Sequence, residues 1–340
     1  MRDLRVGIIG YGLSGRDFHA PLIRDAEGLR ITHVVTGDAA RAAQAAEDNP
    51  GVRVVATVAE LLSHASSLDL VVVASASGVH VEHARAAVER GVPVVVDKPL
   101  ATDLASGRAL VERAREQKVP LTVFQNRRWD SEHLTARAVL GSGALGELVR
   151  YEARYDRWRP VPKSRWRENV PSELGGGLLM DLQPHLVDGA LDLFGPVQSV
   201  YAELQSVTTV ADDVSFLVLT HRTGMRSHLG ATSLAGAPGP RTRILGREAS
   251  YLVAGLVGEP TAFSGWVDQS EGHRGWLVRG ADAEPVQRAP GGWGDYYPAV
   301  VSMLRESTPP PVDPDEAVAV LEVLDAARRS AREDAVIPLG

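Results

Sequence analysis

The sequence contains no cysteine, and this absence excludes several chemistries at once. Without thiols the chain forms no disulfide, no thiolate metal site and no cysteine nucleophile. It also contains no apolar run of the length that a bilayer-spanning helix needs. The N-terminus enters a strand-like segment almost at once, so we expect no secretory signal. These features together predict a protein of a reducing compartment, the cytoplasm.

Positive charge is also in deficit. Lysine and arginine number 36 against 43 aspartate and glutamate residues, which gives a formal net charge of −7. This balance disfavours nucleic acid and anionic membranes as partners and leaves a small molecule as the expected ligand. The 340 residues exceed one typical domain, and a hydrophobic content of 44% is sufficient for ordinary globular cores. We therefore expect two domains.

A glycine turn at the start of the chain is the feature around which the rest is organised. The strand-like run 4–9 ends in G-x-G-x-x-G, formed by Gly10, Gly12 and Gly15. Gly10 permits the tight turn, Gly12 allows close approach of a pyrophosphate, and Gly15 allows the next helix to pack against the strand. The helix N-terminus offers unpaired N–H groups to the phosphates. The motif predicts dinucleotide binding, with a plain tight turn in an α/β protein as the alternative.

Up to about residue 124, apolar strands and helices alternate. Pro21 is expected to kink or end the first helix. The expected strands are 4–9, 29–36, 51–55, 68–74, 92–96 and 120–124, and the expected helices are 16–25, 38–47, 58–64, 80–90 and 103–117. Such alternation, with near-continuous apolar strands, predicts an α/β fold with a doubly wound parallel sheet, a Rossmann domain over residues 1–123.

Beyond residue 124 strands predominate. A helix is expected at 130–140, another at 178–194, and a final one at 315–332, capped by Asp313 and packed back towards the first domain. The strands expected between them are 148–155, 197–207, 214–221, 226–232, 241–245, 249–253 and 275–279. This order predicts an α+β domain, residues 124–340, with a large and mostly antiparallel open sheet.

Ligands of an open α/β sheet bind outside the carboxyl ends of its strands. Polar residues gather at four such ends, which buried-core packing does not explain. The residues that we expect to bind the cofactor are Gly10, Tyr11, Gly12, Leu13, Ser14, Gly15, Thr36, Arg41, Ser75, Ser77, His80, Asp97, Lys98 and, from the second domain, Trp166.

Three residues are candidates for catalysis. Lys98 follows a buried strand, where its ammonium could stabilise charge on a substrate oxygen, or it is an ordinary lysine at a strand end. Asp181 and His185 are four apart, so a helix would put them on one face, and His185 could exchange a proton with a substrate hydroxyl. Pro184 requires that this helix be kinked or begin only near Asp181. A capping aspartate and a structural histidine are the alternative, and no further residues at suggestive spacing favour a metal site.

Three segments combine basic and aromatic residues. They are 126–130, 157–160 and 165–167, with the sequences NRRWD, RWRP and RWR. Guanidinium groups and indole faces suit polyols, phosphates and nicotinamide ribose, while surface ion pairs and domain packing are the alternative. From this set we expect Asn126 and Arg128 to bind substrate, and from the run 175–188 we expect Gln183 to do so.

With these residues in view, the whole chain resembles the glucose–fructose oxidoreductase/inositol dehydrogenase (Gfo/Idh/MocA) family. The resemblance rests on three motifs in order: GYGLSG at 10–15, Asp97-Lys98-Pro99 in place of Glu-Lys-Pro, and the run 175–188, GGGLLMDLQPHLVD. The runs 14–23 and 126–130 look most like the branch with NADPH-dependent scyllo-inositol dehydrogenases. The resemblance implies a Rossmann domain, a second domain whose sheet often forms a homodimer or homotetramer, and a catalytic set of Lys98, Asp181 and His185. It implies His185 as main acid/base, Lys98 as ligand of the reacting oxygen and cofactor, and Asp181 as assistant.

The chain departs from the family pattern at two positions, and its cofactor preference follows from a third. Ser75-Ala76-Ser77 replaces the usual Thr-Pro-Asn, and Gln183 replaces a glycine, where it could narrow the pocket or contact substrate. At the tip of the second strand stands Thr36, not the acidic residue that binds both ribose hydroxyls of NAD, so the sequence favours NADP(H), with NAD(H) the alternative. We read the chain as a NAD(P)-dependent oxidoreductase acting on a sugar, inositol or related polyol. The alternative is a non-catalytic protein that binds cofactor and sugar to regulate a partner.

Overall fold

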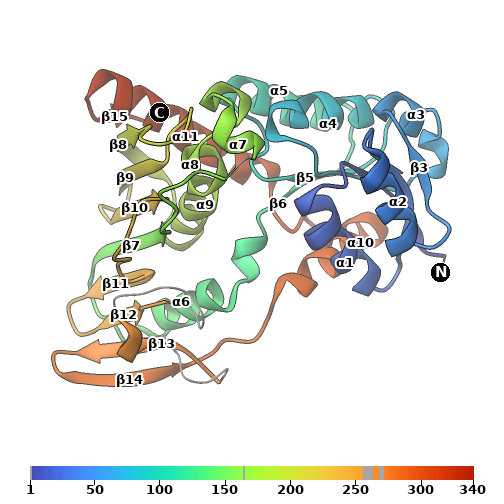
Figure 1. The fold of residues 1–340 in the computed structure, drawn as a ribbon. Coiled ribbons are helices and arrows are strands. Elements are labelled where there is room, and N and C mark those ends of the chain that lie inside the picture. The colour runs from blue at the N-terminus through green and yellow to red at the C-terminus, as the bar shows by residue number, and fades with distance from the viewer. Residues whose placement is uncertain (1, 164, 256–262, 268–271) are drawn as a thin grey trace. The chain divides into compact units, whose positions relative to one another are not determined.

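The computed structural model describes residues 2–163, 165–255, 263–267 and 272–340 (Figure 1). By spatial proximity the chain forms two compact units, each built from two stretches. Unit 1 comprises Met1–Asn126 with Trp293–Leu321, and unit 2 comprises Arg127–Gly292 with Glu322–Gly340. The continuous domains predicted from the sequence, 1–123 and 124–340, stay a prediction.

Unit 1 contains a six-stranded sheet in the order β3-β2-β1-β4-β5-β6. Every neighbouring pair is parallel, which confirms the predicted doubly wound α/β sheet. The strands are β1 (Leu4–Ile9), β2 (Leu29–Val35), β3 (Arg53–Val55), β4 (Leu70–Val73), β5 (Val94–Asp97) and β6 (Leu121–Phe124). The central strands β4 and β5 are buried along their whole length, as their unbroken apolar sequences indicate.

Short polar side chains cap some of the helices of unit 1. Asp38 accepts a hydrogen bond from the Arg41 backbone N–H at 2.9 Å, and Asp103 accepts one from Ser106 at 2.8 Å. The helices are α1 (Ala20–Asp25), α2 (Ala39–Asp48), α3 (Val58–Leu62), α4 (His80–Val88), α5 (Leu104–Glu116) and α10 (Tyr296–Glu306). A π-helical turn over Gly15–His19 leads into α1, and the helix continues past Pro21 to Asp25 instead of ending there.

The late stretch of unit 1 packs against its sheet. Thr122 on β6 donates a hydrogen bond to the Val312 carbonyl oxygen at 2.8 Å and accepts one from the Val312 N–H at 3.2 Å. Tyr296, on the helix α10 that the sequence analysis missed, packs edge-on against Phe124 with ring centroids 4.8 Å apart. Residues near the end of the chain therefore complete the unit begun at its start.

Unit 2 is organised on a nine-stranded sheet in the order β14-β13-β12-β11-β7-β10-β9-β8-β15. All described pairs are antiparallel except β7 with β10, which confirms the predicted, mostly antiparallel sheet. The strands are β7 (Leu148–Asp156), β8 (Val197–Gln205), β9 (Val214–His221), β10 (Arg226–Thr232), β11 (Thr242–Gly246), β12 (Ser250–Val253), β13 (His273–Arg279), β14 (Asp282–Gln287) and β15 (Ile337–Pro338). The last two were not predicted.

Helices cover one face of this sheet, with α9 packed against it (Figure 1). On β9 alternate residues such as Leu217 and Leu219 are fully buried, while Phe216 and Val218 between them are only half-buried. The described helices of unit 2 are α6 (Ser131–Ser142), α7 (Trp166–Asn169), α8 (Leu178–Asp181) and α9 (Gln183–Phe194), and α11 (Pro314–Glu333) crosses the division between the units at Leu321. Among the described residues, no helix is long and apolar enough to span a membrane.

Over 178–194 the structure has two short helices, which agrees with the interruption expected from Pro184 and not with one continuous helix. α8 ends at Asp181 and α9 begins at Gln183, with Leu182 between them at φ −107° and ψ −37°. Pro184 lies in the first turn of α9, where its missing N–H breaks no hydrogen bond. Asp181 and His185 therefore come from two consecutive short helices and not from successive turns of one.

Candidate functional site

In unit 1 the glycine turn has the geometry that its motif predicts. Gly10 has φ +96°, and a Cβ added there would lie 2.8 Å from the Ala74 carbonyl oxygen. A Cβ on Gly15 would lie 2.0 Å from the Gly10 carbonyl oxygen, so helix and strand meet at this point. Beside Gly12, by contrast, the nearest atom is Arg41 Nη1 at 3.9 Å. The turn therefore leaves room for a ligand next to Gly12 and none next to Gly10 or Gly15.

The side chain of Tyr11 is buried beneath the turn and hydrogen-bonded there. It is 1% exposed, and its hydroxyl donates to Asp48 at 3.0 Å and accepts from Asn49 at 2.8 Å. Only the backbone of Tyr11 can therefore meet a cofactor at the turn. Leu13, two residues on, is 58% exposed.

The tip of β2 presents a cation, and the carboxylate nearest to it caps a helix. Thr36 Oγ1 accepts a hydrogen bond from the Asp38 N–H at 3.3 Å, and the Asp38 carboxylate is occupied in capping α2. The exposed Arg41 lies on the first turn of α2 with its guanidinium towards Gly12. A phosphate bound at the glycine turn would have this guanidinium within reach.

The loops after β4 and β5 are tied together by His80. Its buried ring has Nδ1 2.8 Å from the Pro99 carbonyl oxygen and Nε2 3.0 Å from the Ser75 carbonyl oxygen. Both ring nitrogens are occupied, so His80 holds two loops in place and is not directed at a ligand. Ser77 is also buried, whereas Ser75 is half-buried with its hydroxyl 3.0 Å from His83 Nδ1.

Lys98 lies half-buried at the end of β5. The buried Asp97 accepts a hydrogen bond from the Lys98 backbone N–H at 2.8 Å. Behind Asp97 stands His19, fully buried, with Nε2 4.0 Å from Asp97 Oδ1 and Nδ1 2.6 Å from the Tyr297 hydroxyl. Burial lowers the pKa of His19 to about 4, so the ring is neutral at physiological pH. Asn126, at the end of unit 1, is buried as well.

In unit 2 the start of α8 is anchored by Asp212. Its backbone carbonyl accepts from the Leu178 N–H at 2.9 Å, and its carboxyl Oδ2 accepts from the Leu179 N–H at 2.7 Å. Burial raises the pKa of this carboxyl to about 7. At the other end of the same helix, Asp181 lies 3.4 Å from Arg167 Nε, whose guanidinium stacks over the Trp166 ring at 4.7 Å.

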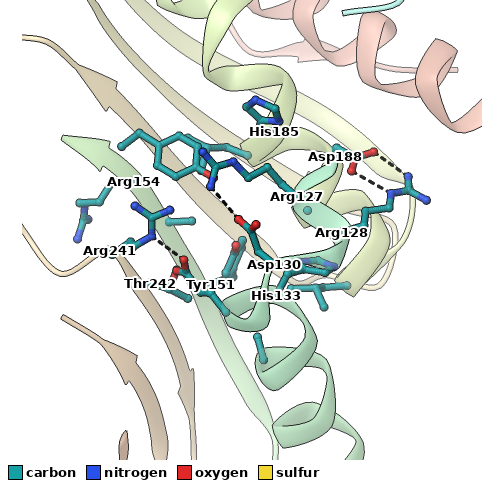
Figure 2. Close-up of a pocket in the computed structure, with 17 residues that line it drawn as sticks. Arg127, Arg128, Asp130, His133, Tyr151, Arg154, His185, Asp188, Arg241 and Thr242 are labelled. Carbon is teal, nitrogen blue, oxygen red and sulfur yellow. Dashed lines mark hydrogen bonds and ion pairs between the residues drawn. The ribbon is translucent and has the colours of Figure 1, made fainter. Parts of the chain in front are cut away.

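His185 lines a pocket between α9, the start of α6 and the strands β7 and β11 (Figure 2). The Tyr155 ring lies edge-on to the imidazole, with centroids 6.5 Å apart. The guanidinium groups of Arg127 and Arg241 lie over the same tyrosine ring at 5.5 and 4.8 Å. The half-buried His185 thus faces a polar, strongly cationic pocket.

Two carboxylates in this region neutralise part of that charge. Arg127 Nη1 lies 2.8 Å from Asp130 Oδ2, and Arg241 Nε lies 2.5 Å from Glu132 Oε2. Arg241 lowers the pKa of Glu132 against the effect of burial. The sequence analysis missed Glu132, Tyr155 and Arg241, because they come together from distant segments and carry no local motif.

The other predicted substrate residues of unit 2 have structural partners. Arg128 forms two hydrogen bonds with the buried Asp188, visible in Figure 2. The side chain of Gln183 is fully buried, and its amide nitrogen donates to Ser215 Oγ at 3.1 Å on the sheet. Gln183 therefore replaces the family's glycine by packing against the sheet, and a contact with substrate would require the amide to leave it.

Over 99% of its length, the chain is 32% identical to scyllo-inositol 2-dehydrogenase (NADP(+)) IolW of Bacillus subtilis, 96% of which is covered. Residues 4–125 match the oxidoreductase family with an NAD-binding Rossmann fold, and residues 133–252 match the GFO/IDH/MocA C-terminal domain. The chain belongs to the GFO/IDH/MocA oxidoreductase family.

Other members of the family agree with this assignment. The solved structure of yvaA from Bacillus subtilis superposes with a TM-score of 0.86 at 29% identity, covering 100% of this chain and 99% of that one. An inositol 2-dehydrogenase of Corynebacterium glutamicum is 34% identical over 44% of each chain. The resemblance identified from three sequence motifs is thereby confirmed, and so is the fold that it implies.

Proposed function

We propose that this family member is a NAD(P)-dependent dehydrogenase that oxidises a hydroxyl-bearing carbon of a sugar, inositol or related polyol, or reduces the corresponding ketone. The observation that supports it best is the glycine turn. Its open side at Gly12 fits a pyrophosphate, and its closed sides at Gly10 and Gly15 fix the turn. When bound there, a nicotinamide cofactor supplies or accepts the hydride.

The chain's own residues would move the proton and orient the substrate. We propose that His185 takes the hydroxyl proton during oxidation and returns it during reduction. Lys98 would donate a hydrogen bond to the reacting oxygen, where its charge stabilises the developing negative charge. Asp181, ion-paired with Arg167, would orient the substrate hydroxyl or the imidazole.

For the cofactor we propose a preference for NADP(H) over NAD(H). Thr36 brings no negative charge to the tip of β2, and the nearby Asp38 is occupied as a helix cap. Arg41 supplies a guanidinium for the 2′-phosphate. The name of the Bacillus subtilis relative, an NADP(+) enzyme, supports the same preference.

The direct test is a cofactor-reduction screen. The purified protein would be offered NADP⁺ and NAD⁺ with a panel of inositols, aldoses and sugar acids, and absorbance of the reduced cofactor would be followed. We expect turnover with at least one polyol and binding of one cofactor at micromolar strength. Absence of cofactor binding at millimolar concentration would reject the proposal at its foundation.

We also propose that the protein assembles as a homodimer or homotetramer through the outward face of the unit 2 sheet. Phe216 and Val218 on β9 are apolar and half-buried on that face, opposite to the face that packs against α9. Apolar side chains on an otherwise polar sheet face favour association because water is released from them.

A further inference from the structure

Two arginines in unit 2 have no role in the mechanism proposed above. Tyr155, Arg157 and Arg159 alternate along the extended segment that continues β7, so they share one face of it. The backbone N–H groups of Arg157 and Arg159 donate to Thr232 and Ser233 at 2.8 and 2.7 Å, which fixes the segment beside the end of β10. Because Tyr155 contacts the His185 ring, this is the face on which the candidate acid/base lies.

These two guanidinium groups differ from the other arginines around them. Arg127, Arg154 and Arg241 each form an ion pair with a carboxylate. Within the described part of the chain, Arg157 and Arg159 form none, although both are half-buried. The pKa of Arg157 is lowered by burial and next by the charge of Arg159. Asp181 acts in the opposite direction, but among the described residues no carboxylate forms an ion pair with either guanidinium.

Most of the nearby carboxylates have other partners, and Glu168, which lines a recess together with both arginines, forms no ion pair with either of them. Asp156 accepts the Gly239 N–H at 3.1 Å, and Asp181 is paired with Arg167. Asp212 and Asp213 accept backbone N–H groups at 2.7 to 2.8 Å. Neither guanidinium is neutralised by a contacting carboxylate of the described residues, so an anionic ligand could pair with both.

A cavity of ligand size adjoins the pair. Arg157 and Arg159 line a recess of about 380 Å³ together with Tyr155, Trp158 and Arg241, within the size range of small-molecule sites. They also line a second recess that contains Asp181. An anion bound between them would therefore lie beside a proposed catalytic carboxylate, and the 58% exposed indole of Trp158 would offer an apolar surface to a sugar ring.

We infer that the substrate of this enzyme is an anionic sugar or polyol, carrying a carboxylate or phosphate that Arg157 and Arg159 bind. The inference rests on the proposed dehydrogenase function and narrows its substrate class. Guanidinium groups bind planar carboxylates and phosphates through paired, charge-assisted hydrogen bonds, and two of them together select against a neutral analogue. The arginine pair thus discriminates charge, while the residues around His185 recognise hydroxyl groups.

Matched ligand pairs test the inference by direct calorimetry on the cofactor-loaded protein. The pairs are D-glucose with D-glucuronate, D-glucose with glucose 6-phosphate, and myo-inositol with myo-inositol 1-phosphate, with inorganic phosphate as an anion without a ring. We expect an anionic member to bind at least about tenfold more tightly than its neutral partner, and its affinity to fall as salt rises. Equal binding of the neutral members, or no binding of any anionic member, would overturn the inference.

Variants assign the effect to the arginine pair. Arg157→Gln and Arg159→Gln should each weaken binding of the preferred anion by about tenfold or more, and Arg157→Lys should retain part of the affinity because it keeps the charge. Arg226→Gln, an exposed arginine at the far end of β10, is the matched control and should change nothing. Thermal unfolding of each variant would verify folding. If Arg157→Gln weakened NADPH binding and left the anion unaffected, the pair would serve the cofactor and the inference would be wrong.

The two proposals fail in different ways. Anion binding that depends on Arg157, without turnover of any compound, would support the subsite and reject the dehydrogenase. Turnover of a neutral polyol that is as fast with Arg157→Gln as with the parent would support the dehydrogenase and reject the subsite.

Discussion

Arg128 and Asp188 form a two-point ion pair, with Nε–Oδ2 and Nη2–Oδ1 distances of 2.9 and 2.7 Å, one helical turn after His185. Asp188 is 1% exposed, and burial raises the pKa of its carboxyl despite the guanidinium. In the next turn of α9, Asp192 lies 2.6 Å from His133 Nε2 and also contacts Arg137. These ion pairs hold α9 against α6 and against the segment that precedes α6. They thereby fix the position of the helix that carries His185.

The first prediction concerns this fastening. Arg128→Gln leaves the carboxylate of Asp188 buried without its counter-charge, so we expect a loss of about 3–5 kcal/mol in unfolding free energy. Urea denaturation would measure it. The matched control is Arg85→Gln, which breaks an exposed pair with Glu89 and should cost at most about 1 kcal/mol. Equal losses of unfolding free energy in the two variants would show that the buried pair stabilises the fold no more than an exposed one.

The second prediction concerns the acid/base. His185→Ala should lower the turnover number by about a hundredfold or more and leave the cofactor dissociation constant nearly unchanged. Steady-state kinetics and cofactor titration would be compared with His64→Ala, a histidine of unit 1 that the mechanism does not use. If Asp181 and His185 act as a unit, the double variant with Asp181→Asn should cost less than the product of the single effects. Full activity of His185→Ala would show that another group, and not His185, transfers the substrate proton.

Cofactor choice gives the third prediction. Arg41→Ala removes the cation nearest to the glycine turn, so NADP(H) affinity should fall by roughly tenfold or more and NAD(H) affinity by much less. Fluorescence titration with both reduced cofactors would measure the ratio. Arg53→Ala, an exposed arginine on β3, serves as the control. Equal losses for the two cofactors would contradict the proposed preference.

The fourth prediction concerns pH. The folded pKa of Asp212 is raised to about 7 from an ordinary 3.8, so folding takes up a proton between these values. Its contribution to stability is therefore greatest at low pH and falls by about 1.4 kcal/mol per unit as the pH rises through that window. Denaturation of the parent and Asp212→Asn between pH 4 and pH 7 should show the difference, since the amide does not titrate. Parallel pH profiles would mean that the carboxyl is not held protonated.

The fifth prediction concerns assembly. Light scattering at micromolar concentration should show a dimer or tetramer, and Phe216→Glu should shift it towards the monomer because the charge would be buried in the interface. Leu252→Glu, which changes another half-buried position on the same sheet, would map how far the interface extends. A monomeric parent protein would reject the proposal.

Local chemistry was sufficient to predict the architecture. The cap residues Asp38, Asp103 and Asp313 mark helix starts, and the apolar runs at β4 and β5 predict buried parallel strands. The strand β14 was missed because it is an exposed strand with Pro285 in its middle and shows no apolar alternation. Pro184 predicted an interruption between α8 and α9, but the apolar spacing runs through Leu182 and did not show where the break lies.

The polar interior of unit 2 could not be predicted in the same way. Arg241 and Glu132 are 109 residues apart and meet only after the sheet has brought β11 to α6. His80 and Tyr11 follow the motifs at cofactor-binding positions, yet their side chains are occupied by Pro99 and Ser75 in one case and by Asp48 and Asn49 in the other. A motif therefore predicts which loop binds the cofactor, but not which side chains of that loop are available to it.

The bond between Thr122 and Val312 has a consequence for how the protein is made. A ribosome releases the first 126 residues long before it reaches the stretch 293–321 that belongs to the same compact unit. During that interval β6 lacks its Val312 partner, and Phe124 and His19 lack the aromatic rings of α10. Part of the apolar surface of the N-terminal half of unit 1 therefore stays uncovered during synthesis until almost the whole chain has been translated.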